Sequence, residues 1–483
     1  MRSYFLHRWE QGVEPLLERL RIAHGTVPPT NPDEYCIIRW GKARLPAKGP
    51  HVLNPLEMTE RTLSGTVWQQ ILQRGGQPAG CVTPPRRWIR EYIVPVFHLT
   101  ALSVWEKAGG PLLQGDVPPN RALRFRELQT PVRGYYANRA MREAVRAIYS
   151  LGLDFGVVHF GVQSDGQMAV TDVQPVPRLN ARLASLFADA IHRFDEELQR
   201  ESVRKTRVIL GADPEFVLRD PKGEVVFASR FMGKSGKVGC DSIVLPDRSK
   251  LYPLAELRPS PASEPAELVR NLWTAMRMAA KIIHDRSLEW VAGGMPAGDM
   301  PLGGHIHFSG VWLNSRLLRV LDNYLALPLL MLEDESTGRR RPKYGFLGDF
   351  RRKAHGGFEY RTLPSWIVSP GIAAGVLSLA RLLAEQYRHL PYLPLNSPEA
   401  QSAYYSGDKR QLLPMVRRVW GELEKLPGYE RDRKFLNALR DKIFRMEGWR
   451  EQDDFRPKWK LTAGKNRTGG GAASPAKSLG PAR

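Results

Sequence analysis

The segment Gly303-Gly304-His305-Ile306-His307-Phe308 constrains the fold of this chain more than any other. Its two histidines are two residues apart in a β-prone segment. Because side chains alternate across a strand, His305 and His307 must project from the same face. The two preceding glycines allow a backbone or a ligand to approach closely. We therefore expect a strand whose two imidazoles lie beside a site.

The same spacing of ionisable groups recurs in three other short segments: Asp213-Pro214-Glu215, Glu256-Leu257-Arg258 and Glu359-Tyr360-Arg361. If all four segments are strands of one sheet, one face of it carries four carboxylates, two histidines and two arginines. Clustered carboxylates repel one another unless a cation lies among them. Carboxylate and imidazole ligands suit Mg²⁺ or Mn²⁺, and arginine binds phosphate in a bidentate manner. The pattern predicts a metal–nucleotide site on an open sheet; the alternative is four amphipathic strands with solvated outer faces.

The net charge of the 483-residue chain is +21, which favours an acidic partner. The charge alone does not distinguish a nucleotide from a polyanionic substrate, a nucleic acid or an anionic surface. No block of lysine and arginine resembles a nucleic-acid-binding arm, so nucleic acid is the less favoured partner. The oligomeric state is left open.

The cysteines and the apolar segments indicate the cellular compartment. Cys36, Cys81 and Cys240 are far apart and odd in number, so they predict neither a disulfide framework nor a zinc site. The first ten residues mix charged and apolar side chains, unlike a signal peptide. No apolar run approaches the length that spans a bilayer. We expect a cytoplasmic protein with no membrane span.

The length allows two or three domains. We expect an N-terminal domain over residues 1–203, a second domain over 204–395, a basic helical extension over 396–461 that covers the sheet, and a disordered basic tail over 462–483. Pro214 cannot donate to a β-ladder, which favours an edge or bulge position for its strand. The patterns also predict a helix over residues 315–335 that is kinked at Pro328, and a later helix that Ser369 caps.

The N-terminal domain contains a hairpin signal, Ser164-Asp165-Gly166-Gln167, between two alternating strands. The segment resembles the closing hairpin of ATP-grasp domains, whose last strand ends in Glu-x-Asn before a proline and supplies Mg²⁺ ligands for ATP. The matching positions here are Asp172 and Gln174, so both ligands are altered. Lys107 is the only lysine between Lys48 and the hairpin, whereas ATP-grasp domains typically hold phosphates with lysines. The resemblance leaves two alternatives, weak nucleotide binding or a degenerate domain.

Five motifs between residues 207 and 390 resemble the type 2 carboxylate-amine ligase (amidoligase) family of the glutamine synthetase and glutamate-cysteine ligase superfamily. They are GADPEF, AELRPSP, GGHIHF, YGFLGDFR and GGFEYRTLPSW. The resemblance implies an α+β protein whose C-terminal domain is an antiparallel sheet with helices packed on one face and an ATP site on the other. It also implies ATP-dependent formation of amide bonds from carboxylate and amine substrates.

The resemblance assigns roles to particular residues. The implied metal ligands are Asp213, Glu215, Glu256, His305 and Glu359. The implied catalytic residues are Glu359, Arg361, Arg351 and Arg258, with Arg351 near the transferred phosphate. The implied nucleotide-binding residues are His307, Arg341 and Asp241, together with Asp172 and Gln174 of the N-terminal domain.

The chemistry of such a ligase explains this set of residues. A carboxylate is a poor acyl donor, so ATP first converts it to an acyl phosphate, which an amine then attacks. Two ligase-type modules in one chain suggest successive amide bonds on a peptide or cell-surface-related substrate. Two alternatives remain at this stage: a noncatalytic polyanion-binding protein on a degenerate ligase scaffold, and a nucleotidyl or phosphoryl transferase that uses the same metals.

Overall fold

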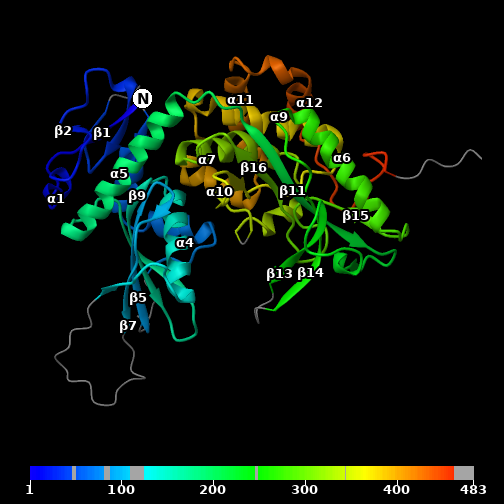
Figure 1. The fold of residues 1–483 in the computed structure, drawn as a ribbon, viewed down its shortest axis with the longest axis horizontal. Helices are drawn as coiled ribbons and strands as arrows, with labels where there is room; N and C mark the ends of the chain where they lie inside the picture. Colours follow the sequence, from blue (N-terminus) through cyan, green and yellow to red (C-terminus); the bar gives the residue numbers. More distant parts are fainter. Residues whose placement is uncertain (46–50, 81–87, 109–124, 245–248, 343, 462–483) are drawn as a thin grey trace, which may run out of the picture.

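The computed structural model describes residues 1–45, 51–80, 88–108, 125–244, 249–342 and 344–461. The predicted tail over 462–483 and Cys81 lie outside these residues. Figure 1 shows two sheets of the N-terminal part beside a larger C-terminal sheet and its helices.

The first sheet is parallel and begins the chain. Its strands are β1 (Arg2–Leu6), β2 (Ala23–Gly25), β3 (Tyr35–Arg39) and β4 (Val52–Leu53), in the order β2-β1-β3-β4. The long helix α5 (Ala181–Ser202) packs against β1, and its apolar face joins that of the sheet in one core.

The second sheet is antiparallel, in the order β10-β9-β5-β7-β8, with β6 paired to β5. Its strands are β5 (Arg90–Phe97), β6 (Thr100–Ala101), β7 (Trp105–Ala108), β8 (Arg126–Glu127), β9 (Phe155–Val162) and β10 (Met168–Gln174). Strands β9 and β10 form the hairpin that the Asp-Gly turn predicts. Helix α4 (Tyr135–Ser150) packs on β5 and β9, and the helices α2 (Leu56–Leu63) and α3 (Val67–Arg74) lie nearby in the same core.

The third sheet contains all four segments that carry paired ionisable groups. Its order is β13-β14-β11-β16-β18-β17, every pair is antiparallel, and β12 (Val225–Val226) and β15 (Glu289–Val291) also pair with β11. The strands that form this order are β11 (Ile209–Arg219), β13 (Val238–Val244), β14 (Lys250–Leu257), β16 (Gly304–Ser309), β17 (Phe350–Arg352) and β18 (Phe358–Tyr360). The prediction that these segments belong to one sheet is confirmed.

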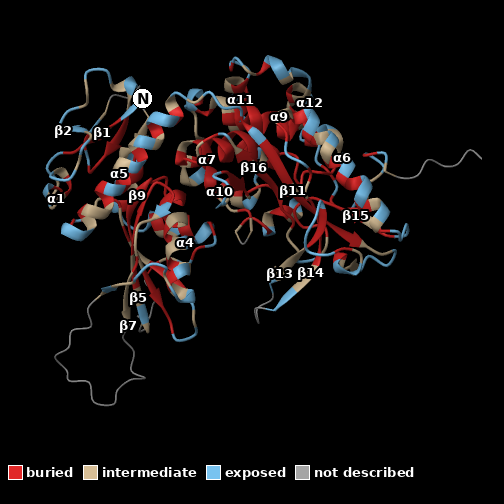
Figure 2. Cartoon of the chain, viewed as in Figure 1, coloured by how far each residue is buried: buried red, intermediate tan, exposed pale blue. Residues whose placement is uncertain are grey.

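One face of this sheet carries the paired ionisable side chains. Apolar side chains cover the opposite face and meet a layer of helices. Phe308 and Phe358 stack there with ring centroids 5.0 Å apart, and both are fully buried. The helices of the layer are α6 (Pro265–Ile282), α7 (Ser315–Leu321), α8 (Leu327–Leu330) and α9 (Pro370–Gln386). Figure 2 shows the resulting buried interior of the C-terminal part. The predicted α+β fold, with helices on one face of an antiparallel sheet, is confirmed.

Helices α7, α8 and α9 lie in the two segments where helices were predicted. Ser369 Oγ accepts a hydrogen bond from Ile372 N at 3.3 Å, so the predicted cap of α9 is confirmed. The helix predicted over residues 315–335 ends earlier and contains a π-helical turn, Asp322–Ala326, between α7 and α8. Pro328 lies in the first turn of α8, where a missing N–H group costs little.

The predicted edge position of Pro214 is wrong, because β11 pairs with β14 on one side and β16 on the other. The N–H of the next residue, Glu215, bonds to Gly303 O in the loop before β16. Neighbouring N–H groups of a strand point to opposite sides, so the nitrogen of Pro214 faces β14. Strand β14 pairs with β11 only at Glu215 and Phe216, and the proline therefore interrupts no pair.

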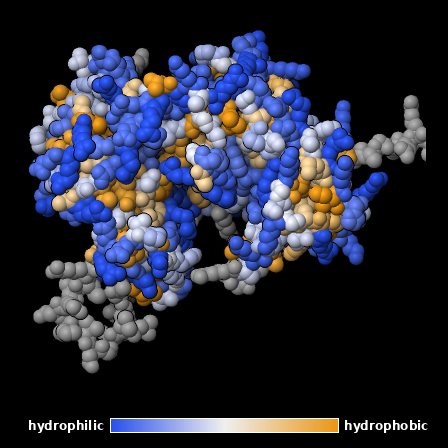
Figure 3. Space-filling model, viewed as in Figure 1, coloured by the Kyte–Doolittle hydropathy of each residue, from blue (hydrophilic) through white to orange (hydrophobic). Residues whose placement is uncertain are grey.

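The extension after residue 396 forms the helices α10 (Pro398–Ser406), α11 (Lys409–Leu423) and α12 (Arg433–Arg445). Helix α11 packs on α8, and α12 packs on α9. The expectation that this extension covers the sheet is wrong. The extension instead covers the helix layer, and α9 is buried between the sheet and the extension. Among the described residues, no helix is both long and apolar enough to cross a bilayer. The molecular face in Figure 3 is mainly hydrophilic, with scattered apolar patches.

Candidate functional site

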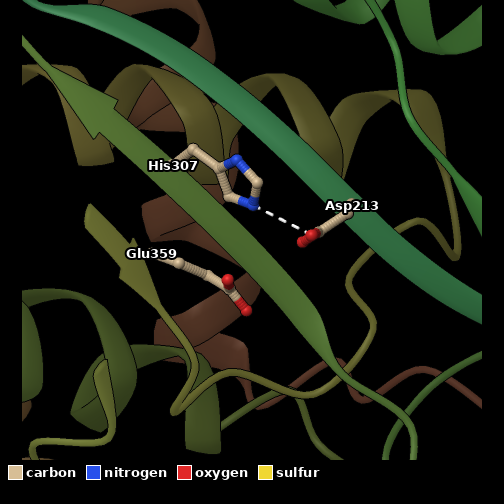
Figure 4. A group of neighbouring side chains, drawn as sticks. All are labelled: Asp213, His307 and Glu359. Carbon is tan, nitrogen blue, oxygen red and sulfur yellow. Dashed lines mark ion pairs between the residues drawn. The ribbon is translucent and has the colours of Figure 1, made fainter. Parts of the chain in front are cut away.

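Asp213, His307 and Glu359 converge from three neighbouring strands, as Figure 4 shows. The ladder pairs His307 with Glu359 and places Asp213 opposite His305. His307 Nε2 lies 2.9 Å from Asp213 Oδ2. One ligand atom from each of Asp213, His307 and Glu359 falls within 4.8 Å of the others, which is a geometry that suits one cation.

The two glycines before the histidines are required by close packing. A Cβ atom on Gly303 would lie 2.2 Å from His305 Nε2, and one on Gly304 would lie 2.2 Å from Pro364 O. Any larger residue would displace the imidazole or the neighbouring backbone.

His305 is held at both ring nitrogens. Nδ1 lies 3.2 Å from Asp213 Oδ1 and 3.4 Å from Glu359 Oε1, and Nε2 lies 2.8 Å from Tyr344 Oη. Only 2% of His305 is exposed, so these contacts replace water. The position suits a residue that orients the two carboxylates.

A second acidic group forms where β11, β13 and β14 adjoin. Ligand atoms of Glu215, Asp241 and Glu256 lie within 4.8 Å of one another. Glu215 and Glu256 are opposite each other in the ladder, and Glu215 Oε2 accepts a hydrogen bond from Gly303 N at 2.7 Å. Three carboxylates in one buried place suit a second cation.

The electrostatics of this second group reflect its burial. Burial raises the pKa of Glu215 well above its usual range, and the charges of Glu256 and Asp241 raise it further, against the hydrogen bond from Gly303. Burial, followed by the charge of Asp213, raises the pKa of Glu256 to about 8, although Arg258 opposes the shift. Without a cation, the carboxyl groups of Glu215 and Glu256 therefore retain their protons at a higher pH than free carboxyl groups do.

The first group is electrostatically different. Burial alone would raise the pKa of Asp213, but His305 and His307 outweigh it and lower the pKa below its usual value. Burial also opposes ionisation of Glu359, whose pKa His305 and Arg361 nevertheless lower. Both carboxylates are therefore ionised at neutral pH.

Cationic side chains surround Glu359 at the end of the sheet. Lys353 Nζ lies 2.5 Å from Glu359 Oε2, Arg351 Nη1 lies 3.7 Å from the same oxygen, and Arg361 pairs with Oε1. Arg361 Nε also lies 3.9 Å from Asp349 Oδ1. Side chains of this kind stabilise negative charge on a phosphoryl group.

Sequence reasoning missed three residues of this cluster: Tyr344, Asp349 and Lys353. Lys353 follows Arg351 by two residues, so the same spacing argument places it on the same face. Tyr344 and Asp349 lie in the YGFLGDFR motif, whose irregular backbone has no periodicity from which to read a direction.

The structure brings together the predicted residues of the C-terminal sheet. Arg258, for example, pairs with Glu256.

Arg341 is placed elsewhere: it is buried, pairs with Glu333 and contacts no cluster carboxylate among the described residues. Asp172 and Gln174 lie on β10 of the second sheet, where Gln174 Nε2 donates to Asp172 Oδ2 at 2.9 Å. The roles assigned to all these residues stay predictions.

Three solved structures show likeness to the chain at low identity. A complex of the prokaryotic ubiquitin-like protein Pup with its ligase PafA is 14% identical, with 51% of this chain and 66% of that chain covered and a TM-score of 0.34. A bifunctional glutathione synthetase from Pasteurella multocida is 9% identical, with 52% and 50% covered and a TM-score of 0.32. The ATP-grasp ligase PsnB, in complex with a minimal precursor, is 10% identical, with 40% and 99% covered and a TM-score of 0.28.

No curated protein sequence matches the chain. A family model does match: phage phiEco32-like COOH.NH2 ligase-type 2, over residues 210–461. This match spans more than half of the chain and includes every strand that carries the cluster. The chain therefore belongs to the phage phiEco32-like COOH.NH2 ligase-type 2 family.

Proposed function

We propose that this ATP-dependent carbon–nitrogen ligase joins a carboxylate to an amine through an acyl phosphate, at the face of the third sheet that is opposite the helix layer. The observation that supports the proposal most is the convergence of two acidic groups and a set of cationic side chains on one face of that sheet. An amphipathic sheet with a solvated outer face does not require buried carboxylates, whereas a phosphoryl-transfer site does.

The residues fit divalent cations. Asp213 Oδ1 is buried and, among the described residues, accepts no well-aligned hydrogen bond, although His305 is near. We propose that Asp213, His307 and Glu359 hold one cation and that Glu215, Asp241 and Glu256 hold another. Bound Mg²⁺ or Mn²⁺ would neutralise phosphate oxygens of ATP.

This proposal changes the roles that the family resemblance implies for the two histidines: His307 becomes the metal ligand and His305 a positioning residue. His305 has both ring nitrogens engaged and orients Asp213 and Glu359. His307 is the imidazole that offers a ligand atom to the first acidic group, beside Asp213 and Glu359. Orientation of ligands by neighbouring hydrogen bonds is a usual feature of metal sites.

The cationic side chains act on the substrates. Arg351, Lys353 and Arg361 would stabilise the charge that develops as the γ-phosphoryl group moves to the substrate carboxylate. Arg258, beside Glu256, would contact phosphate from the other end of the cluster. Glu359 is ionised and is the proposed acceptor of the proton that the attacking amine loses.

We also propose that residues 1–203 form an ATP-grasp-like unit that precedes the glutamine-synthetase-like unit over residues 204–395. The β9–β10 hairpin with Asp172 and Gln174 supports this proposal. A second ligase-type unit would suit a peptide or cell-surface-related substrate that receives successive amide bonds.

The test is ADP release from ATP and Mg²⁺ in mixtures of amino acids and peptides. Replacement Glu256→Gln should lower turnover by about 10²-fold or more, because it removes one ligand charge from a buried group. Glu289→Gln is the matched control, since Glu289 lies on β15 of the same sheet and pairs with Arg219 outside the cluster. Equal turnover in both variants would defeat the site, and AMP in place of ADP would indicate nucleotidyl transfer.

A further inference from the structure

A cavity of about 810 Å³ lies between the N-terminal and C-terminal parts of the chain. One wall comes from α5 and the turn between β5 and β6, and the other from the loop after β16 and the turn between β17 and β18. None of the predicted site residues lines it, so it is distinct from the acidic cluster.

The cavity and the cluster nevertheless share one structural element. Lys353 and Gly357, in the turn that connects β17 to β18, line the cavity. The same Lys353 reaches Glu359 with its Nζ atom, at 2.5 Å from Oε2. The Lys353 side chain therefore contacts both the cavity and Glu359 of the proposed active site.

Most charges in the cavity wall are already paired. Arg200 pairs with Glu196 and Glu197, and Arg204 pairs with Glu201 at 2.9 Å. These ion pairs leave little attraction for a ligand.

Two guanidinium groups are different, and they come from opposite walls. Arg193 on α5 makes no ion pair or hydrogen bond with any described residue. Within the described part of the chain, Arg352 on β17 makes one long hydrogen bond, from Nη2 to Thr100 Oγ1 at 3.5 Å, and its guanidinium carbon lies 5.9 Å from the ring centroid of Phe350. The charge of Glu197 acts on Arg352, but Glu197 already pairs with Arg200. Both positions attract an anion.

The floor of the cavity is aromatic and uncharged. The His98 ring packs against Phe194 and Trp312, with centroid distances of 4.5 Å and 5.0 Å. Burial lowers the pKa of His98 to about 3, so the ring is neutral. An uncharged floor with cationic groups on both rims suits an extended chain that carries separated anionic groups.

We propose that this cavity binds an acidic peptide, the carboxylate substrate of the ligase, through Arg193 and Arg352. The proposal rests on the proposed function, because a carboxylate-amine ligase must recognise a carboxylate-bearing substrate. Guanidinium groups bind carboxylates in a bidentate manner, and two of them on opposite walls select for at least two carboxylates. A further carboxylate of the same peptide would then extend past Lys353 toward Glu359.

The test is a direct binding measurement that needs no turnover. Isothermal titration calorimetry of the full chain without ATP would compare triglutamate with triglutamine as probes. We expect measurable binding of triglutamate and at least tenfold weaker binding of triglutamine. Arg193→Gln and Arg352→Gln should each weaken triglutamate binding about tenfold, as for the loss of one charge-assisted hydrogen-bonded pair.

Arg142→Gln is the matched control, because Arg142 is an exposed arginine on α4 outside the cavity and its replacement changes the net charge equally. It should leave the affinity unchanged within about twofold. Arg193 and Arg352 are also exposed at the rim, so both variants should melt like the parent chain.

Each remaining outcome has a definite meaning. No detectable binding of triglutamate, equal affinity in all variants, or equal affinity for triglutamine would overturn the proposal. So would tighter binding of a DNA oligonucleotide that the same two arginine variants weaken. If ADP release persists while triglutamate binding is absent, only the cavity assignment fails. If triglutamate binds as described and ADP is never released, the ligase mechanism fails instead.

Discussion

Asp322 links the N-terminal helix α4 to strand β18, which carries Glu359. Its Oδ2 atom accepts a hydrogen bond from Tyr149 at 2.7 Å, and Oδ1 accepts one from Tyr360 at 2.7 Å. Only 2% of Asp322 is exposed. Burial raises its pKa to about 7, although both tyrosines favour the charged form. This carboxyl group is therefore partly protonated at neutral pH.

The raised pKa predicts how stability changes with pH. Because the folded pKa of about 7 exceeds the value of 3.8 for a free aspartate, folding takes up a proton between these values. The contribution to stability is full below about pH 4 and is lost as the pH rises through about 7. Between pH 5 and pH 8 the loss amounts to about 3 kcal/mol.

Replacement Asp322→Asn should remove this part of the pH dependence. Asparagine retains a hydrogen-bonding side chain of the same size and cannot ionise. Thermal unfolding of both proteins at pH 5 and pH 8 would measure the effect, and other carboxyl groups cancel in the comparison. Parallel pH profiles for the two proteins would contradict the assignment.

At the scale of elements, α4 contacts the loop that includes residues 340–342 and 344–349. The guanidinium carbon of Arg146 lies 3.6 Å from the ring centroid of Phe346, and Arg146 Nη2 donates to Pro342 O at 3.2 Å. A Cβ atom on Gly348 would lie 2.2 Å from Tyr149 Cε1. This loop supplies Tyr344 and Asp349 to the cluster, so a helix of the N-terminal part positions residues of the C-terminal site.

Replacement Arg146→Ala should therefore lower turnover. We expect kcat to fall about tenfold, because small displacements of positioning groups reduce rates strongly. Arg142→Ala is the matched control for Arg146→Ala, because Arg142 is an exposed arginine on the same helix. ADP release measures the effect, and a normal rate in Arg146→Ala would show that α4 does not position this loop.

Much of the site could be predicted at this scale, because alternation along a strand is a local property. The pairs Asp213 with Glu215 and His305 with His307 depend only on two-residue spacing. The partner of each strand depends on contacts distant in sequence, so the double pairing around Pro214 was not predictable. Tyr344 and Asp349 lie on irregular backbone, where no periodic pattern gives a direction. The proposed positioning role of His305 likewise depends on its contact with Tyr344.

At the scale of the whole molecule, the two halves of the chain share one core. Leu99 and Tyr149 of the N-terminal part belong to the same buried cluster as the helices behind the third sheet. Arg319, 9% exposed, donates from α7 to the backbone oxygens of Tyr149 and Leu153, at 3.1 Å and 2.7 Å. The C-terminal half thus depends on the N-terminal half for part of its burial and hydrogen bonding.

A truncated chain of residues 207–461 should consequently be less stable than the full chain. Removal of the N-terminal part exposes apolar surface, leaves buried Arg319 without Tyr149 O and Leu153 O, and leaves buried Asp322 without Tyr149. Thermal unfolding and binding of a hydrophobic dye would test this expectation. A truncated chain that melts like the full chain and binds no dye would show that the halves are independent.

The strand register has an evolutionary consequence. Ile306 and Phe308 alternate in sequence with His305 and His307, and both are fully buried on the helix side of β16. Duplication of one codon within β16 would turn the following side chains to the opposite face, which would place an imidazole in the core and an aromatic ring among the carboxylates. Lineages of this protein can therefore gain or lose residues in surface turns, whereas β16 can change only by substitution.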